Sequence, residues 1–278
     1  MTKRLSAIVT VMLSLAMLTG CPPEQGQLVD VGGFSLFYNQ QGAGAYTVLF
    51  ENGLSDNSSV WAKVQPEIAK VANTVSYDRA GVGGSDRGPD PRHGLNIAEE
   101  LHTMLQNANI PGPYILCAQS EGGMFARLFA SLYPGEVAGM VLIEARHEDQ
   151  DKVEAMRLSA EQAIEIIDVG TLDVNVLGGV GSRGEFVNLQ NTYEQLKANP
   201  DIPQVPLVVM RAKGEALKPS EQAAIDQIKL EFQEQMAALS ANSTMVYVPD
   251  SGHDIQKQKP QAVINAIQSI LDQLAASE

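Results

Sequence analysis

Cysteine and positive charge are scarce in this chain. Only two cysteines, Cys21 and Cys117, occur among the 278 residues, so no intramolecular disulfide framework is expected. The 19 Lys and Arg residues are outnumbered by 33 Asp and Glu residues, which gives a formal net charge of −14. Such a chain repels phosphate backbones, and nucleic acid is therefore not expected as a partner.

Sets of residues with metal-ligand spacing are also lacking. The chain has four histidines, and the carboxylates that come nearest to suggesting a cluster are Asp56, Asp86 and Asp149. No His, Cys or Asp set supports these three with the spacing that a metal site needs. We expect neither a metal nor another cofactor.

The N-terminal apolar run is too short to span a bilayer. Residues 5–18 give 14 residues, LSAIVTVMLSLAML, whereas a spanning helix needs ~20. Because the run follows the basic start MTKR, it predicts an export signal peptide over residues 1–20. The segment that ends it, Leu18-Thr19-Gly20-Cys21, resembles a bacterial lipobox, which implies cleavage before Cys21 and lipid on its sulfur. An ordinary secretory signal with an incidental cysteine is the alternative.

A lipid anchor determines where the protein is expected. Residues 21–26 then comprise the lipidated cysteine and a polar Pro/Gly tether, and two or three acyl chains hold such a protein stably on a membrane. The residue after Cys21 is Pro22 rather than Asp, which does not resemble an inner-membrane retention signal. We expect a lipid-anchored protein of the bacterial cell envelope, on the outer membrane or cell surface rather than the inner membrane.

From residue 27 onward, strand and helix patterns alternate. A hairpin is expected around Gly32-Gly33, followed by apolar, β-branched runs and segments with apolar residues at helical spacing. The expected strands are 46–51, 73–78, 114–118 and 139–144, and the expected helices are 60–72, 96–110 and 123–133. This alternation predicts an α/β fold with a doubly wound, mostly parallel sheet.

The alternation breaks at about 146–205. This segment is too long for a connecting loop, so it predicts a small helical cap inserted between two late strands of the 27–278 domain. Within it we expect a helix over 147–170, an irregular Gly-rich stretch over 170–186 and a second helix over 188–203. The sheet pattern resumes at 205–212, and the expected helix 219–239, strand 243–249 and helix 260–275 complete the domain.

The sequence Ala118-Gln119-Ser120-Glu121-Gly122 lies between an expected strand and an expected helix. A nucleophile placed on such a sharp turn needs small residues two positions before and two positions after it. Ala118 stands where a glycine is usual, and the pattern alone is weak, because a serine that caps a helix gives a similar one.

Three further segments carry a family resemblance. Residues 76–86 (SYDRAGVGGSD), 48–61 (VLFENGLSDNSSVW) and 248–267 (VPDSGHDIQKQKPQAVINAI) resemble, in order and spacing, conserved turns of the α/β-hydrolase fold family. With the Ser120 turn they cover residues 27–278 apart from the cap. The resemblance implies a serine hydrolase with Ser120 as nucleophile and His253 as its base.

The acid that orients His253 has two candidates. Most family members place it near Glu215, whereas a subset that resembles haloalkane dehalogenases places it at Glu144, after the strand that follows the nucleophile helix. We favour Glu144, because it ends an apolar strand whose tip faces the expected site. A structural carboxylate at Glu144 and a solvated loop charge at Glu215 are the non-catalytic interpretations.

The resemblance also implies an oxyanion hole formed by two backbone N–H groups, those of Leu54 and Glu121. Asp78 and Arg79, although they belong to a motif, are expected to brace loops rather than to join the triad. The other three histidines, His93, His102 and His147, are expected on the surface or in packing, with His147 also able to line the pocket.

These residues together predict a serine hydrolase that cleaves small carboxylic esters through an acyl-enzyme. A peptidase or a carbon–carbon bond hydrolase keeps the same triad and is an alternative. A lipid-anchored binding protein that retains the fold without catalysis is the alternative from another class.

Overall fold

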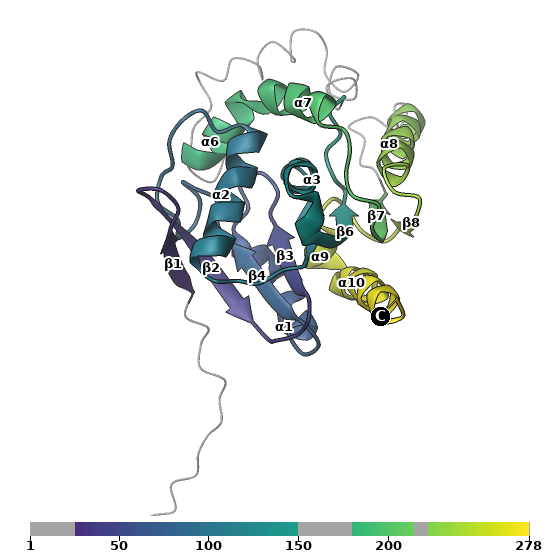
Figure 1. The fold of residues 1–278 in the computed structure, drawn as a ribbon. Helices are drawn as coiled ribbons and strands as arrows, with labels where there is room; N and C mark the ends of the chain where they lie inside the picture. Colours follow the sequence, from purple (N-terminus) through teal and green to yellow (C-terminus); the bar gives the residue numbers. More distant parts are fainter. Residues whose placement is uncertain (1–25, 150–179, 214–221, 278) are drawn as a thin grey trace, which may run out of the picture.

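The structure is a computed structural model, and it describes residues 26–149, 180–213 and 222–277. In these ranges eight strands form one sheet with the order β1-β2-β4-β3-β5-β6-β7-β8 (Figure 1). Cys21 and Glu215 lie outside the described residues, so lipidation and the alternative acid remain predictions. The strands are β1 Gln27–Asp30, β2 Ser35–Gln41, β3 Thr47–Glu51, β4 Asn73–Tyr77, β5 Tyr114–Gln119, β6 Val137–Ile143, β7 Leu207–Ala212 and β8 Ser243–Val248.

The sheet is parallel from β4 through β8, and β1 and β2 add an antiparallel hairpin at one edge. All residues of β3, β4 and β5 are buried. Helices on both faces bury a parallel sheet, which is why β3 and β5 are mostly apolar in the sequence. Strand β4 also buries polar side chains, Asn73, Thr74 and Ser76, and each of them has a hydrogen-bond partner. The predicted fold class is confirmed.

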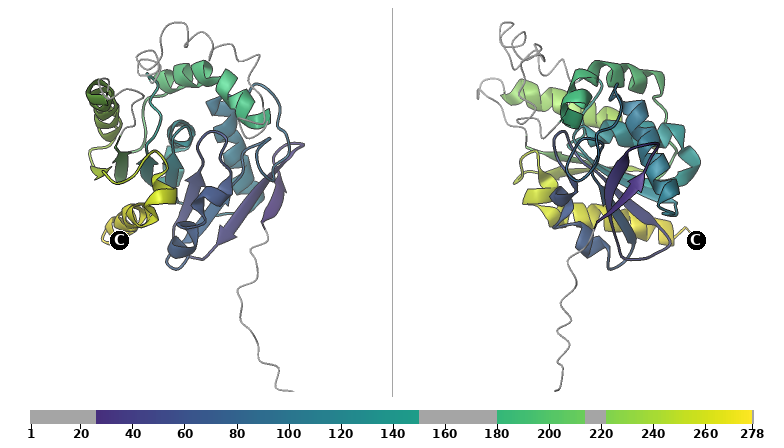
Figure 2. Two further views of the ribbon diagram at one scale, coloured as in Figure 1. Left: turned by 180° about the vertical axis from the view of Figure 1, so that it is seen from behind. Right: turned by 90° about the vertical axis from the view of Figure 1, so that its left-hand side faces the viewer.

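Helices lie on both faces of the sheet (Figure 2), and each face has its own hydrophobic core. One core packs against α2, α3, α7 and α8, and the other packs against η1, α1, α9 and α10. The helices are η1 Ser58–Trp61, α1 Gln65–Ile68, α2 Gly94–Asn107, α3 Gly122–Leu132, η2 Pro134–Glu136, α6 Val180–Val187, α7 Leu189–Ala198, α8 Gln222–Ala237, α9 Ile255–Gln258 and α10 Pro260–Ala275.

The single helix predicted over 60–72 is wrong. The segment forms two short pieces instead, η1 and α1, joined by a turn at residues 62–64. Pro66 explains the break, because it has no N–H to donate to the preceding turn and fits only in the first turn of a helix. It occupies the first turn of α1.

The Gly-rich stretch over 170–186 was expected to be irregular, and its last part is not. Residues 180–187 form α6, while 170–179 and most of the predicted helix 147–170 lie outside the described residues. The glycines of α6 permit close packing: a Cβ on Gly181 would lie 2.0 Å from the carbonyl oxygen of Ala80, and one on Gly184 would lie 2.6 Å from Cγ of Arg92. Here glycine indicates a close approach between segments rather than a loop.

Helices α6 and α7 lie across the carboxyl ends of the strands, at the top of Figure 1. Side chains of α7 complete the N-terminus of α2: Thr192 Oγ1 accepts from the Gly94 amide at 3.0 Å, and Gln195 Oε1 accepts from the Leu95 amide at 3.0 Å. The first turn of a helix has amides without partners in the helix itself. These bonds therefore fix this part of the cap on the body of the domain.

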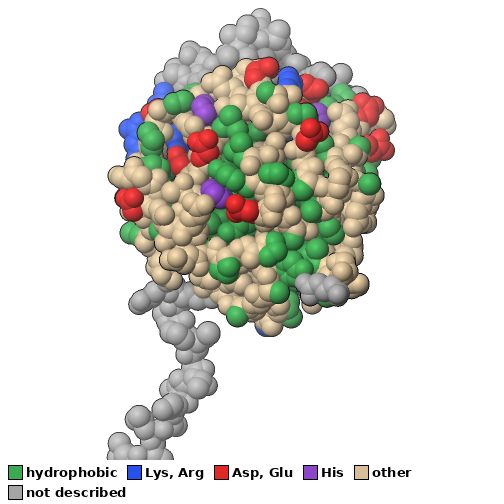
Figure 3. All heavy atoms as spheres, viewed as in Figure 1, with side chains coloured by type: hydrophobic (Ala, Val, Ile, Leu, Met, Phe, Trp, Pro, Cys, Tyr) green, Lys and Arg blue, Asp and Glu red, His purple; other side chains and the backbone are tan. Residues whose placement is uncertain are grey.

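Acidic side chains stand in small separate groups on the face of the molecule shown in Figure 3, with apolar side chains between them. Within the described ranges, no helix has the length and apolar character needed to cross a bilayer.

An ion pair between Arg127 of α3 and Glu148 fixes the chain where it leaves β6 for the cap. The Arg127 Nη1 and Nη2 atoms lie 2.7 and 3.1 Å from the two Glu148 carboxylate oxygens. Burial pushes the pKa of Glu148 up, but the hydrogen bonds and charge of Arg127 outweigh it and hold that pKa at about 2. Because the pKa is lower in the folded state, the pair stabilises the fold fully above the ordinary carboxyl pKa, and the effect is lost as the pH falls toward 2.

We expect Glu148→Gln to lower the free energy of unfolding by about 2 kcal/mol at pH 7, and the difference from the wild type to shrink steadily below pH 4. Urea unfolding at pH 7, 5 and 3.5 measures this. Glu67→Gln is the control, because Glu67 pairs with Lys70 on the surface and should change stability little at any of these pH values. A Glu148→Gln deficit that stays constant with pH would show that the ion pair is not its cause.

Candidate active site

Ser120 lies in the tight turn that joins β5 to α3. Its φ is 54°, a left-handed conformation that is uncommon for a residue other than glycine. The turn is fixed on both sides: the Ser120 amide donates to the Ile143 carbonyl at 3.0 Å, and the Ser120 carbonyl accepts from the amides of Gly123 and Arg146 at 3.0 and 2.9 Å. Strained backbone that the surroundings hold this firmly is typical of a functional site.

The residues around Ser120 show why the turn needs small side chains. A Cβ on Gly122 would lie 2.5 Å from the Asn52 carbonyl oxygen, and one on Gly123 would lie 2.5 Å from Cβ of Ala145. Ala118 is fully buried in the core that packs against α2 and α3, so its methyl group is accommodated inside the sheet. The glycines that the turn requires are thus Gly122 and Gly123, and the departure at Ala118 does not disturb them.

Glu144 directly follows β6 and is also left-handed, with φ 45°. Its amide donates to the Met210 carbonyl at 2.9 Å, and its Oε1 accepts from the Ala212 amide at 2.8 Å, which ties it to β7. Its Oε2 lies 3.5 Å from Nδ1 of His253. The structure therefore brings the favoured acid and the predicted base together.

The carboxylate of Glu144 has three partners that favour its charged form. Burial would raise the pKa of Glu144, but the hydrogen bond with His253, the charge of Lys229 and the amide of Ala212 outweigh it, so the pKa lies below its usual range. The Lys229 Nζ atom of α8 lies 3.5 Å from Oε2 of Glu144. A carboxylate that stays ionised can orient an imidazole and stabilise its cation.

His253 lies in the loop between β8 and α9, and about half of its side chain (54%) is exposed. Its carbonyl accepts from Nε2 of Gln119 at 3.5 Å, which places the loop beside the residue that precedes Ser120. Among the described residues, no hydrogen bond joins the Ser120 hydroxyl to His253. In enzymes without bound substrate such bonds are often long, and they tighten when the substrate binds.

The predicted oxyanion turn lies beside Ser120. It follows β3, and a Cβ on Gly53 would lie 3.3 Å from Cβ of Ser120 and 2.3 Å from Oε1 of Gln119. The Leu54 amide donates to no acceptor within the described part of the chain, which leaves it available to a ligand. Glu121 directly precedes α3, and the amides at a helix N-terminus favour negative charge.

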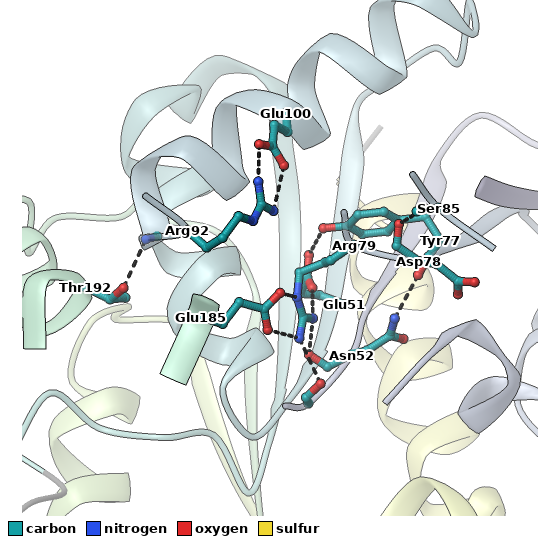
Figure 4. A network of polar contacts seen from close by, with 12 residues as sticks. Glu51, Asn52, Tyr77, Asp78, Arg79, Ser85, Arg92, Glu100, Glu185 and Thr192 are labelled. Atoms are coloured by element: carbon teal, nitrogen blue, oxygen red, sulfur yellow. Dashed lines mark hydrogen bonds and ion pairs between the residues drawn. The ribbon is translucent and has the colours of Figure 1, made fainter. Parts of the chain in front are cut away.

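Several side chains brace this turn, as Figure 4 shows. Asn52 Nδ2 donates to the Tyr77 carbonyl at 2.7 Å, and Asn52 Oδ1 accepts from Nε1 of Trp61 at 2.7 Å. Asp78 accepts from the amides of Ser58 and Gly84 at 2.7 and 2.8 Å. Asp78 thus braces loops, as the sequence predicted.

Sequence reasoning missed four residues of this region: Glu51, Tyr77, Glu185 and Lys229. Glu51 had a usable signal, because a charged residue that closes a buried apolar strand needs a partner. The other three had none, since their roles depend on contacts between segments far apart in the chain.

The remaining histidines have packing and surface contacts. His93 caps α2 through the Asn96 amide, and His102 lies 3.0 Å from Glu136. The ring of His147 stacks on Phe232 of α8, with centroids 4.4 Å apart. These contacts support the roles predicted for them.

The three aspartates considered as a possible metal cluster each have a different partner. Asp56 pairs with Lys257 at 3.1 Å, Asp149 pairs with Lys197 at 3.6 Å, and Asp86 accepts from the Ser35 amide at 2.9 Å. Within the described ranges, no three His, Cys, Asp or Glu side chains are grouped so that they could hold a metal ion.

Comparisons with known proteins point to one family. Residues 46–231 match the family model of the alpha/beta hydrolase fold. An uncharacterized Bacillus subtilis protein, YqjL, is 24% identical over 242 residues, which are 84% of this chain and 86% of that protein. The 2-(acetamidomethylene)succinate hydrolase of Mesorhizobium japonicum is 22% identical over 280 aligned positions, covering 88% of this chain and 94% of the hydrolase.

Solved structures give the same fold. A thermophilic esterase from Thermogutta terrifontis superposes with a TM-score of 0.66 at 20% identity, covering 90% of this chain and 98% of the esterase. The family match spans more than half of the chain, and its boundaries contain β3, the Ser120 turn and Glu144. The chain therefore belongs to the alpha/beta hydrolase fold family.

Proposed function

We propose that this protein is a serine hydrolase that cleaves carboxylic esters, with Ser120 as nucleophile, His253 as base and Glu144 as the orienting acid. The observation that carries the proposal is the contact of 3.5 Å between Glu144 Oε2 and His253 Nδ1, beside a strained serine at the end of β5. A serine hydroxyl needs a base, and the base needs an acid to hold its tautomer.

The proposed reaction proceeds in two halves. Ser120 Oγ attacks the ester carbonyl carbon while its proton passes to Nε2 of His253, since Nδ1 faces Glu144. The N–H groups of Leu54 and Glu121 bind the oxyanion that forms. The tetrahedral intermediate then collapses and expels the alcohol, which takes the proton from His253. An acyl-enzyme remains on Ser120. Water then attacks the acyl carbon and gives a proton to His253. His253 returns this proton to Ser120 Oγ as the carboxylic acid departs.

The relatives support an ester or a related acyl substrate without identifying it. The similar proteins include an esterase and a hydrolase, each at 22% identity or less. A peptidase or a carbon–carbon bond hydrolase uses the same residues, because the fold sets the triad and the cap sets the substrate. No described contact favours either of them over an ester.

A fluorophosphonate probe and a panel of p-nitrophenyl esters of increasing acyl length test the proposal on the protein that lacks residues 1–20. We expect one covalent adduct per chain and hydrolysis that depends on acyl length. A peptide p-nitroanilide serves as the comparison substrate and should react far more slowly. Folded protein that takes no label and cleaves no ester would support the alternative of a non-catalytic binding protein.

A further inference from the structure

Arg79 is a buried guanidinium beside the proposed oxyanion turn. It follows β4, and its side chain is 1% exposed. Its Nη1 donates to Oε1 of Glu51 and to the Asn52 carbonyl, both at 2.7 Å, and its Nη2 donates to the Gly53 carbonyl at 2.9 Å. Its Nε and Nη2 donate to the two carboxylate oxygens of Glu185 at 2.8 and 2.9 Å. All five N–H donors of the guanidinium are thus used (Figure 4).

The bond to the Gly53 carbonyl has a direct consequence for the oxyanion hole. The carbonyl of Gly53 and the N–H of Leu54 belong to the same peptide group. A trans peptide group is planar, so its C=O and N–H point in opposite directions and turn together. When Arg79 holds the Gly53 oxygen, it therefore also sets the direction in which the Leu54 N–H points.

Glu185 connects Arg79, and through it the Gly53–Leu54 peptide group, to the cap. It lies on α6, and its carboxylate takes two of the five guanidinium hydrogens in a bidentate pair. Planar, paired contacts of this kind fix the orientation of a guanidinium more firmly than single bonds do. On its other side, Arg79 is held by Glu51, which also accepts from the Tyr77 hydroxyl. Without Glu185, the guanidinium keeps three acceptors and loses the pair that fixes its plane.

We propose that Arg79 and Glu185 are positioning residues for the oxyanion hole, and that helix α6 of the cap, through Glu185, helps to direct the Leu54 N–H toward the substrate. This inference rests on the proposed function. It assigns to the cap a part in the rate of the chemical step, in addition to any part in choosing the substrate.

The chain offers a matched control in a second buried Arg–Glu pair. Arg92 pairs with both carboxylate oxygens of Glu100, and its side chain is 2% exposed. Gly184 of α6 packs against Arg92, so this pair also lies under the cap. Neither Arg92 nor Glu100 makes a hydrogen bond with the oxyanion turn in the described part of the chain. A change here should therefore cost stability without disturbing Leu54.

The experiment compares Glu185→Gln and Arg79→Lys with Glu100→Gln and Arg92→Lys, at a temperature at which all four are folded. Removing one oxyanion donor typically lowers kcat ~10²–10³-fold, and a misdirected donor should cost part of that. We expect kcat to fall ~10-fold or more for Glu185→Gln, and further for Arg79→Lys, with KM within ~3-fold of the wild type. The two control variants should keep kcat within ~3-fold while their melting temperatures fall.

A second readout isolates the oxyanion hole. Sulfur accepts hydrogen bonds poorly, so an enzyme with well-aimed donors cleaves an oxygen ester faster than the matching thionoester. Glu185→Gln should bring the two rates closer together, whereas Glu100→Gln should leave their ratio unchanged.

Any one of the following results would overturn the inference. Equal losses of kcat in the Glu185 and Glu100 variants would show a structural effect only, and so would a Glu185→Gln change confined to KM. An unchanged thionoester ratio in Glu185→Gln would show that the oxyanion donors are not involved. If the wild type neither takes the label nor cleaves esters, the proposed function fails and this inference fails with it. If the wild type is active and Glu185→Gln and Arg79→Lys keep its kcat, the inference alone fails.

Discussion

Ser120→Ala should lower kcat/KM for an activated ester by ~10⁴-fold or more and abolish labelling by a fluorophosphonate. The expected loss is large because alanine has no atom that can form the acyl-enzyme, and only the oxyanion donors and substrate binding remain. The fold should survive, because the substitution keeps a Cβ at the same left-handed position, φ 54°, and removes only the hydroxyl. Steady-state kinetics and intact-protein mass spectrometry measure the two effects.

Ser269→Ala is the control for Ser120→Ala. Ser269 lies on α10, and its hydroxyl donates to the Ala266 carbonyl within the same helix at 2.8 Å. That variant should keep full activity and label normally. If Ser120→Ala still takes the label at the wild-type rate, another residue is the nucleophile and the assignment fails.

Glu144→Gln has the second-largest expected effect, a fall in kcat of ~10³–10⁴-fold. A Gln side chain can still accept from the Ala212 amide, so the local structure should persist. It cannot stabilise the imidazolium by its charge, and its amide hydrogens favour the wrong tautomer of His253. Because the acid does not touch the substrate, KM should change little. Kinetics on the folded variant, checked by circular dichroism, measure the loss.

Glu215→Gln decides between the two acids that the sequence left open. It should reduce kcat by no more than ~3-fold if Glu144 orients His253. A severe loss in Glu215→Gln together with a mild one in Glu144→Gln would assign the acid to Glu215 instead. In that case the contact between Glu144 and His253 would be structural.

The fold and the tight turn at Ser120 were predictable because they depend on local rules. Strands buried on both faces give continuous apolar runs, and the backbone at Ser120 demands small neighbours such as Gly122. The position of Ser120 between β5 and α3 follows from these two patterns alone. Local rules also explain the error at 60–72, where apolar spacing suggested one helix but Pro66 divided it.

The rest of the site depends on contacts that sequence spacing does not reveal. Glu144 and Glu215 both follow strands whose carboxyl ends meet at one edge of the sheet, so position alone allowed either to reach His253. The bond from Lys229 to Glu144 joins residues 85 positions apart, and the pair of Arg79 with Glu185 joins residues 106 positions apart. No periodicity or motif indicates pairs at such separations.

The bond between Arg79 and Glu185 also bears on the engineering of this domain. Exchanging caps between related hydrolases is an obvious route to new substrate ranges, because the cap is inserted as one segment between β6 and β7. A hybrid whose new cap offers no carboxylate at the position of Glu185 would leave the guanidinium of Arg79 buried with unused donors. A buried charge that loses its partner is costly, so such a hybrid would fold less stably and react more slowly on every ester. A successful graft would therefore carry its own glutamate for Arg79.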